Sequence, residues 1–575
     1  MRNYVAPVNA LEPIEERIIE FMGLNRKSAV EDGEMSDMLN LSSDKYPLLA
    51  PRPLRGSYPL PSGVLRPLKL ETRYNKLAMI ARKTDDSIAF YFDGEEITAV
   101  DNLTDSSEMV AINTKICFFP EKTYLEVTID NSGQVTLGDY EPLDNAFDNS
   151  QTGLAVDVTV TTDNVVMTLP SGHGFGYDDA INIDGSVIYT KESTTQSMDV
   201  TASTAITAAT DTTIEIPAGT FIELEGATNI TFRGTIKRDI PDMDIITEWN
   251  NRLWGANNRD NTIYACKLGD PKNWQYFQGT SLDSYYAQQG TDGDWTGVAP
   301  YSGHLAFFKE SSMCKIYGTA PSNYQIANVE CYGVEKGSRR SVVTINDTVF
   351  YKSQIGIMAY DGAVPVCISE KFNCKFKNVI GGTENTKYYA SIQKQGGGYE
   401  LMVLDIDRAV WHKEDSKRMR HACTVNNRLY FAEYEDAELL CADDLFCDDY
   451  LIMGSDDVEG TVCISNPLVA SETYDELPSM AVFGPFDEYI EEHKIYSKLA
   501  LRLIIHSGTA LNVYIKLNDG EWELVKSFNP AETHGEVVPI IPRRCDRYSV
   551  KIEATGNYEI KSLTRRVRQG TFGKL

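Results

Sequence analysis

Pairs of short aromatic strands joined by tight turns recur along this chain, and this rhythm restricts its fold more than any other feature. After residue 241, each unit has an apolar strand, a tight turn and a second strand rich in aromatic residues. The clearest units are 251–268, 302–318, 346–362, 386–414 and 426–443. Runs of Val, Ile, Tyr and Phe bounded by turn residues are typical of β-hairpins. Hairpins repeated at roughly 40 to 50 residues indicate the blades of a β-propeller.

The same rhythm occurs earlier, between residues 77 and 130. Four short runs rich in Val, Ile, Tyr and Phe lie there, and Asp93-Gly94 between two of them is a hairpin-turn signature. Together the early and late units predict about seven blades. An irregular array of β-sandwiches is the alternative, because no unit carries a strict signature such as a WD pair.

The first 71 residues have a different character. Apolar residues spaced by four, three and three positions from Ile14 to Leu24 predict a short helix over 11–24. The following segment carries six Pro between residues 36 and 67, which blocks helices and central strands and predicts an extended arm. Such an arm either packs along its own body or wraps over a neighbour. We expect it to be disordered alone and to order on docking.

Two further domains interrupt and follow the hairpin series. Residues 141–230 keep strand alternation but hold 14 acidic residues and a single basic one, Lys191. This composition predicts a small β-domain inserted into one blade. The C-terminal residues alternate cleanly over 497–525, with an Asp519-Gly520 hairpin turn, and indicate a jelly-roll-like β-sandwich.

The predicted architecture is therefore all-β. It comprises an N-terminal helix and Pro-rich extended arm (1–71), first propeller blades (72–140), an inserted acidic β-domain (141–232), the remaining blades of a multi-bladed β-propeller (233–480) and a C-terminal β-sandwich (481–575).

Motifs that carry chemistry are missing from the sequence. The 11 Cys include no CxxC pair, and the seven His form no HxH or HExxH arrangement. Neither a GxSxG elbow nor a phosphate-binding loop is present. We therefore predict no catalytic, cofactor-binding or metal-binding residues and expect a protein that is not an enzyme. Because propeller glycosidases use paired carboxylates, a hydrolase is the less favoured alternative.

The N-terminus lacks an uncharged apolar core, and no run of about 18 apolar residues exists. The sequence predicts neither a signal peptide nor a membrane span, and it predicts synthesis in a cytoplasm.

Negative charge is concentrated in two segments. The formal net charge is −29, and residues 433–459 contain 11 acidic residues and no basic one. Such segments are solvated loops, Ca²⁺ ligands, or a lining that repels DNA phosphate and leaves a duplex mobile. The candidate lumen-facing acidic residues are Glu435, Asp436, Glu438, Asp443, Asp444, Asp448, Asp449, Asp456 and Asp457. The candidate interface residues are Tyr46, Leu48, Leu49, Arg565, Arg566 and Arg568.

The segment EWNNRLWGANNRDNTIYACKLGDPKNWQYF (248–277) resembles a blade of phage tail and virion proteins of the nozzle type. That family's line has the form N-R-L-W … I-Y-x-S-x-x-G-D-P-x-N-W, and Cys266 stands here where Ser is usual. The line at 305–318 is similar to that family's second hairpin. The start (32–53) and the end of the chain resemble virion proteins of phages infecting Gram-positive gut bacteria.

This resemblance implies a structural protein of the bacteriophage virion. Nozzle-type proteins of short-tailed phages form a closed ring below the portal and adaptor, prolong the DNA channel, and help to retain the packaged genome until ejection. The implied partners are other copies in a hexameric ring, the adaptor or portal-proximal proteins, other tail subunits and passing double-stranded DNA. The inserted acidic domain departs most from the family, which has no enzymatic residues to carry over.

A peripheral tail adhesin that binds a host cell-surface glycan is the alternative function. Its sugar platforms would be aromatic side chains, with Trp295, Trp411 and Trp522 as the candidates.

Overall fold

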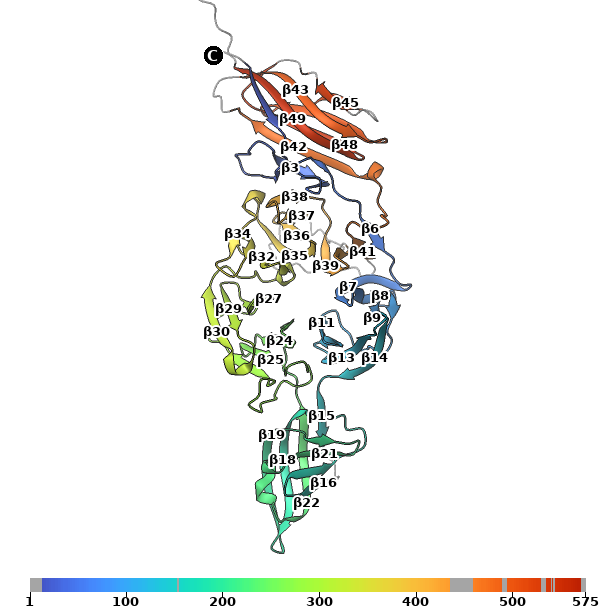
Figure 1. The fold of residues 1–575 in the computed structure, drawn as a ribbon, viewed down its shortest axis with the longest axis vertical. Helices are drawn as coiled ribbons and strands as arrows, with labels where there is room; N and C mark the ends of the chain where they lie inside the picture. Colours follow the sequence, from blue (N-terminus) through green and yellow to red (C-terminus); the bar gives the residue numbers. More distant parts are fainter. Residues whose placement is uncertain are drawn as a thin grey trace, which may run out of the picture. The chain divides into compact units, whose positions relative to one another are not determined.

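The computed structural model describes residues 13–151, 155–434, 459–488, 494–528, 534–538, 540 and 543–569. Within these ranges the regular structure is β-strand with five short 3-10 helices, and they contain no α-helix. The chain divides into two compact units. Figure 1 shows the strands coloured along the sequence. The first unit comprises Met1–Leu70 and Gly337–Leu575, and the second unit comprises Glu71–Lys336. The all-β class predicted from the sequence is confirmed.

Four sheets of four strands each belong to the second unit, and the strands of each sheet follow one another in chain order. Only the first strand of the first sheet begins before the unit boundary. The strands are β7 (Val64–Arg73), β8 (Lys76–Lys83), β9 (Ile88–Phe92) and β10 (Glu95–Glu96); β11 (Glu108–Ile112), β12 (Lys115–Phe119), β13 (Thr123–Ile129) and β14 (Val135–Pro142); β23 (Ile245–Trp249), β24 (Arg252–Asn257), β25 (Thr262–Ala265) and β26 (Tyr285–Gln288); and β27 (Gly297–Tyr301), β28 (His304–Phe308), β29 (Ser312–Tyr317) and β30 (Gln325–Glu330).

The inserted β-domain is confirmed and lies between the second and third of these sheets. It forms one eight-stranded sheet of order β19-β18-β22-β16-β17-β21-β20, with β15 paired to β22. Its own apolar core includes Ile183, Val187 and Phe232. Its strands are β15 (Asn145–Asp148), β16 (Val156–Val160), β17 (Asn164–Thr168), β18 (Ala180–Lys191), β19 (Thr194–Ala205), β20 (Ala208–Ala209), β21 (Thr213–Pro217) and β22 (Thr228–Arg238).

The first unit holds three more four-stranded sheets, and the last of them takes its outer strand from the N-terminal segment. In that sheet β6 (Gly56–Tyr58) pairs with β41 (Thr461–Ile464), so that Tyr58 lies opposite Val462. The described residues thus form seven such sheets, which we call blade sheets. The other strands are β31 (Val343–Ile345), β32 (Thr348–Ser353), β33 (Gly356–Tyr360) and β34 (Val366–Cys367); β35 (Phe376–Glu384), β36 (Lys387–Lys394), β37 (Tyr399–Asp405) and β38 (Val410–Lys413); and β39 (Met419–Val425) and β40 (Arg428–Glu433).

The two middle strands of the blade sheets carry the aromatic rhythm that the sequence displays. Every residue of β24 and of β28 is buried, whereas the outer strand β30 is largely exposed. A middle strand pairs on both edges and is covered on both faces, so apolar and aromatic residues predominate along it. The predicted turn at Asp93-Gly94 joins β9 to β10, and both residues have positive φ as a tight hairpin turn requires.

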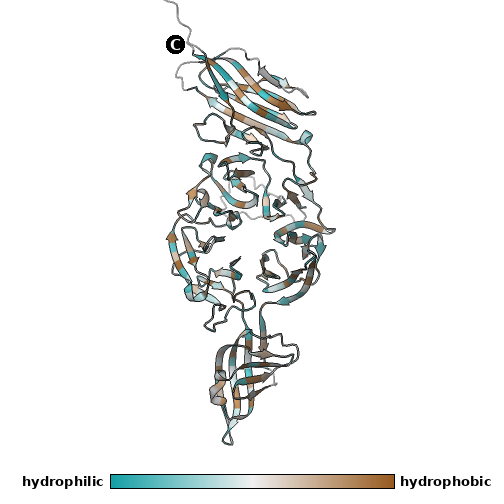
Figure 2. Ribbon diagram, in the orientation of Figure 1, coloured by the Kyte–Doolittle hydropathy of each residue, from teal (hydrophilic) through white to brown (hydrophobic). Residues whose placement is uncertain are grey.

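A C-terminal β-sandwich completes the first unit and confirms that prediction. Strands of both of its sheets contribute to one apolar core, and β48 alternates buried and half-buried residues along its whole length. Hydrophilic and hydrophobic residues follow one another along the strands of the sandwich (Figure 2). One sheet has the order β1-β49-β43-β46 with β47 paired to β43, and the other has the order β2-β3-β42-β48-β44-β45. The strands are β1 (Ile14–Ile18), β2 (Gly23–Leu24), β3 (Glu34–Leu39), β42 (Pro478–Phe486), β43 (Lys494–Ile505), β44 (Ala510–Leu517), β45 (Glu523–Phe528), β46 (His534–Val538), β47 (Arg544–Cys545), β48 (Tyr548–Thr555) and β49 (Tyr558–Gln569).

The helix predicted over 11–24 is wrong. Residues 14–18 form β1, which pairs antiparallel with β49, with Ile14 opposite Val567 and Ile18 opposite Leu563. Spacings of three and four residues favour a helix locally. Here, however, the segment forms the edge strand of a sandwich sheet beside β49, and pairing satisfies its backbone hydrogen bonds.

The Pro-rich arm packs along its own body, which decides between the two alternatives and corrects the expectation of disorder. Met35, Met38 and Leu49 are buried in the core that the sandwich shares with the blade sheets of the first unit. Leu49 also exchanges two backbone hydrogen bonds with Ile560. The arm contributes β3, β4 (Leu41–Ser42), β5 (Ala50–Pro51) and β6, with Pro residues between these short pairings.

Two arginines of the arm lie at the centre of a buried ion-pair network. The guanidinium of Arg55 contacts the carboxylates of Glu414 and Asp415, which follow β38. Arg52 pairs with Glu472 at 2.7 Å, and the same carboxylate accepts the backbone N–H of Arg55 at 2.8 Å. These arginines hold the pKa values of Asp415 and Glu472 below their usual range. The network fixes the chain just before it enters β6.

We predict that Arg55→Met weakens this network strongly, because Glu414 and Asp415 keep their charges without the partner. Removing one member of a buried pair costs about 3–5 kcal/mol. Hydrogen exchange in denaturant should show earlier opening of peptides over 34–58 and 410–433. Lys76→Met is the control, since it breaks an exposed pair with Asp93 and should cost at most about 1 kcal/mol. Equal effects of the two substitutions would contradict this role.

Candidate functional site

The nine candidate lumen-facing acidic residues, from Glu435 to Asp457, lie outside the described residues. Their placement therefore stays a prediction. Acidic side chains of the inserted domain are described, and most of them are exposed, including Asp157, Asp184 and Asp199. These carboxylates form a solvated negative surface.

The candidate interface residues divide into internal and accessible ones. Leu49 and Arg565 are buried, which corrects their assignment to an interface. Arg565 pairs with Asp32 and Glu488 of its own unit, and its guanidinium lies 3.9 Å from the centroid of the Phe486 ring. Tyr46, Leu48 and Arg566 are half-buried and Arg568 is exposed, so the prediction still stands for these four.

Two of the three proposed sugar platforms are buried. Trp295 is 3% exposed and Trp411 is 4% exposed, so neither ring can stack on a sugar, and this prediction is wrong. Both rings fill apolar cores. Trp522 is half-buried, and the ammonium of Lys551 lies 5.1 Å from its ring centroid.

The segment that carries the family resemblance is a structural element of the second unit. Arg252 is fully buried in β24. Its guanidinium donates to the backbone carbonyls of Cys266, Ser281 and Asp283 at 2.7 to 2.8 Å. One arginine side chain thereby holds both ends of the long loop between β25 and β26.

The GDP-x-NW part of this loop contacts the inserted domain. Asp270 accepts a hydrogen bond from the Asn273 amide at 2.6 Å, and Asn273 Oδ1 accepts the backbone N–H of Ala180 at 2.6 Å. Lys267 forms an ion pair with Asp178, which also accepts the hydroxyl of Tyr276 at 2.9 Å. We call this set of contacts the insert clamp. The insert clamp gives the GDP-x-NW motif a structural role, so the motif can be explained without a catalytic role.

Large aromatic side chains are exposed beside the insert clamp. Tyr177 is 75% exposed, Phe277 is 48% exposed and Tyr286 is 62% exposed. The rings of Phe277 and Tyr286 meet edge to face at 5.8 Å between centroids. We call these three residues the aromatic face. Exposed aromatic groups of this kind are typical of protein contact surfaces.

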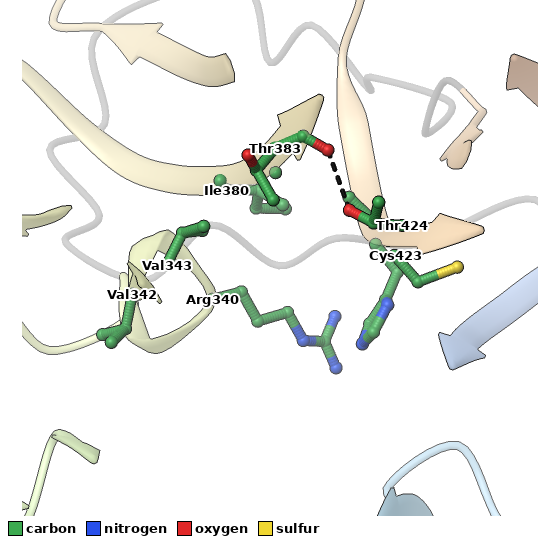
Figure 3. Close-up of a pocket in the computed structure, with 11 residues that line it drawn as sticks. Arg340, Val342, Val343, Ile380, Thr383, Cys423 and Thr424 are labelled. Carbon is green, nitrogen blue, oxygen red and sulfur yellow. Dashed lines mark hydrogen bonds between the residues drawn. The ribbon is translucent and has the colours of Figure 1, made fainter. Parts of the chain in front are cut away.

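A pocket of about 270 Å³ lies in the first unit, where the first strands of three blade sheets approach one another (Figure 3). The 3-10 helix η3 (Arg339–Ser341) and the strands β31, β35 and β39 supply its walls. Arg340 extends from η3 across the pocket toward β39 (Figure 3). The lining residues are Arg340, Val342, Val343, Ile380, Gly381, Gly382, Thr383, His421, Ala422, Cys423 and Thr424.

Packing between neighbouring strands accounts for the two glycines of the pocket. A Cβ on Gly381 would lie 2.8 Å from the carbonyl oxygen of Ser341, and one on Gly382 would lie 2.5 Å from Leu429 Cδ1. Because Gly381 and Gly382 have no side chain, β35 can lie close to its neighbours at both positions. The hydroxyl of Thr424 donates to the carbonyl of Thr383 at 2.8 Å and ties β39 to β35.

Glu71 on β7 is an acidic residue with a raised pKa, and no sequence motif points to it. Its pKa is raised to about 7, chiefly by burial and further by the negative charge of Glu108 on β11, although a hydrogen bond from the backbone N–H of Thr72 lowers it. A carboxyl group that stays protonated near neutral pH, close to a second carboxylate, is a common arrangement at functional sites.

Groups of three or more His, Cys, Asp and Glu able to hold a metal ion are not found in the part of the chain that the structure describes. Helices long and apolar enough to cross a membrane are also missing from that part.

Comparison with known proteins gives distant similarities only. No family model matches the chain, and no curated protein matches it. Similar solved structures include an exo-β-1,3-galactanase from Phanerochaete chrysosporium (10% identity, 56% of this chain and 94% of that chain, TM-score 0.21). They also include a putative 6-phosphogluconolactonase from Bacteroides fragilis (12% identity, 59% of this chain and 93% of that chain, TM-score 0.27). The phage phi92 endosialidase is a third (9% identity, 78% of this chain and 75% of that chain, TM-score 0.23). TM-scores of this size assign no activity to the chain.

We predict that Glu71→Gln stabilises the protein at pH 8 and leaves it unchanged near pH 4. The folded-state pKa is about 7 and the unfolded value about 4.5, so the wild-type protein loses stability as pH rises between them. The gain at pH 8 should be roughly 1–3 kcal/mol, measured by urea unfolding. Glu95→Gln, at an exposed carboxylate of β10, is the control. An equal gain at both pH values would contradict the titration of Glu71.

Proposed function

We propose that this chain is a non-enzymatic structural subunit of a bacteriophage tail. In this proposal it forms part of a nozzle or hub ring that extends the DNA channel, helps to retain the packaged genome and allows its ejection. Its partners are other copies of itself, the adaptor or portal-proximal proteins and other tail subunits. It acts in the virion after synthesis in the bacterial host cytoplasm.

The observation that carries the proposal is the role of residues 248–277. This segment resembles the nozzle-type blade, and its distinctive residues are used for scaffolding: Arg252 holds the loop and Asn273 belongs to the insert clamp. A recognition motif that serves the architecture supports a role in assembly better than a role in catalysis.

Charge and exposed surface support the same proposal. The net charge is −29, so the protein as a whole repels DNA phosphate and lets a duplex pass without being retained. The aromatic face offers a surface on which another subunit can pack, because Tyr and Phe supply large contact areas with few rotatable bonds.

A hydrolase is the alternative function that can be tested at specific residues. Burial raises the pKa of Glu71 to about 7, the charge of Glu108 contributes to this shift, and a raised carboxyl pKa is one feature of the acid that a glycosidase uses. Release of sugars from host envelope polymers that is lost in Glu71→Gln and Glu108→Gln would favour it.

We predict that the protein lies on the tail axis of the virion. Virions carrying a small tag between Gly396 and Gly398, in the turn between β36 and β37, should show a symmetric ring of label around that axis by electron microscopy. An added side chain at any glycine of this turn meets no atom within 4 Å, so the tag should be tolerated. Label found only on peripheral fibres would favour the adhesin, and tag-free virions are the control.

We predict that the aromatic face is a subunit contact. The double substitution Phe277→Lys and Tyr286→Lys places two charges there, and incorporation into virions should fall at least tenfold, as measured by quantitative mass spectrometry. Ile129→Lys is the matched control, because Ile129 is 44% exposed on another sheet of the same unit. Circular dichroism should show that all variants fold. Normal incorporation of the double variant would contradict this contact.

A further inference from the structure

The sheet of the inserted domain ends in a long strand with an open edge. Among the described strands β19 pairs with β18 alone, and their register runs without a shift from the pair Ala180 and Ala205 to the pair Lys191 and Thr194. In the part of the chain that the structure describes, the backbone of 194–205 makes no hydrogen bond outside this pairing. One edge of a strand of 12 residues therefore keeps its donors and acceptors for another partner.

The pairing on the other side of β18 shows which backbone groups of β19 point outward. A Cβ on Gly234 of β22 would lie 2.2 Å from the carbonyl oxygen of Asp184, so this carbonyl points toward β22. Backbone groups alternate in direction along a strand, and Thr201 lies opposite Asp184, so the N–H and C=O of Thr201 point away from β18. The alternate residues that share this direction are Thr195, Ser197, Asp199 and Ser203.

The edge of β19 lacks the features that protect sheet edges against pairing with other chains. Such edges are usually short, charged, bulged or interrupted by Pro. In this chain β10 consists of two Glu, β1 has three charged residues among five, and the pairing of β14 shifts register between Leu125 and Val127. β19 contains neither Pro nor Lys, and Asp199 is its single charged residue. Its edge is therefore open to an added strand.

The two faces of the sheet differ in chemistry at this edge. On one face Val200 is buried, and the half-buried Met198 packs against the apolar core of the inserted domain. On the other face Asp184 and Asp199 are exposed. Because side chains alternate between the faces of a strand, an added strand that fits this edge alternates between two kinds of residue. Its apolar side chains would lie beside Met198 and its other side chains beside Asp199.

The charge of the second face selects cationic side chains for the added strand. The Asp184 carboxylate accepts the hydroxyl of Thr201 at 3.1 Å, and within the described residues neither it nor Asp199 forms an ion pair. The exposed cations of this face, Arg233 and Lys237, belong to β22 and are separated from the edge by β18. Opposite charges on neighbouring strands stabilise their pairing, so Lys or Arg is favoured beside Asp199.

We propose that the free edge of β19 binds an extended segment of another protein as an added strand, in which cationic and apolar residues alternate. Backbone hydrogen bonds to the outward residues of β19 supply affinity, and the alternating side chains supply specificity. This inference goes beyond the proposed tail function and does not depend on it, because the edge can take a segment of this chemistry wherever the protein acts.

Fluorescence anisotropy of a labelled peptide with the full chain tests the proposal. The peptide spans the length of 195–203 and has alternating Lys and Val. It should bind the wild-type protein, whereas a peptide of alternating Glu and Val should not, because its carboxylates would face Asp184 and Asp199. The Lys and Val peptide with all backbone amides N-methylated should bind at least roughly tenfold more weakly, because it keeps its charges and loses its donors.

Substitutions at the edge separate the backbone from the side chains. The N–H of Ser197 points outward, so Ser197→Pro removes a donor of the edge without removing a hydrogen bond to β18. This variant should bind the Lys and Val peptide roughly tenfold more weakly. Ser197→Ala is the matched control and should bind like the wild-type protein. Asp199→Lys leaves the backbone unchanged and should also weaken binding, because it repels the peptide. Circular dichroism should show that all variants fold.

Hydrogen exchange and sedimentation provide the remaining outcomes. The Lys and Val peptide should lower deuterium uptake over 194–205 in the wild-type protein and not in Ser197→Pro. Equal binding of the N-methylated peptide, or no binding of the Lys and Val peptide by the wild-type protein, would overturn the proposal. Dimers of the wild-type protein that are lost in Ser197→Pro would show that a second copy occupies the edge, and would overturn it as well.

Discussion

The buried arginines Arg52 and Arg55 are the interaction on which the first unit depends. They fasten the N-terminal segment to Glu414, Asp415 and Glu472, which come more than 350 residues later in the chain. Once this segment is fastened, β6 can complete the blade sheet of β39–β41, and β3 can pair with β42 of the sandwich. One polar network therefore holds elements of two kinds of sheet, and a shared apolar core covers the contacts around it. Because each charge has a partner, burial of the network does not leave an isolated ion.

The position of a strand within its blade sheet explains whether the strand could be predicted from the sequence. Middle strands such as β24, β28 and β32 are buried along almost their whole length and rich in apolar and aromatic residues, so their hairpins were recognisable as a repeat. Outer strands such as β26 and β30 alternate or are mostly polar, because one edge or face is in water. They resemble loops in the sequence, and only pairing with a neighbour makes them strands.

The N-terminal segment shows the limit of local periodicity. The same apolar positions from Ile14 to Leu24 satisfy a helix, and the segment is nevertheless an edge strand beside β49. The decision was made by a partner more than 500 residues away, which no window of sequence contains. The tryptophans show the same limit, since an aromatic residue in a covered strand and one at a binding surface look alike until burial is known.

The sequence by itself determined the all-β class, the hairpin repeat, the inserted acidic domain and the C-terminal sandwich. These follow from residue type and alternation, which act between near neighbours along the chain. Only the tertiary structure decided that the Pro-rich segment packs inside its own unit and that the GDP-x-NW loop clamps the inserted domain. Convergence of residues from distant strands depends on sheet pairing and on the close approach that Gly381 and Gly382 permit. Those are long-range properties, and the order of residues along the chain does not contain them in any local form.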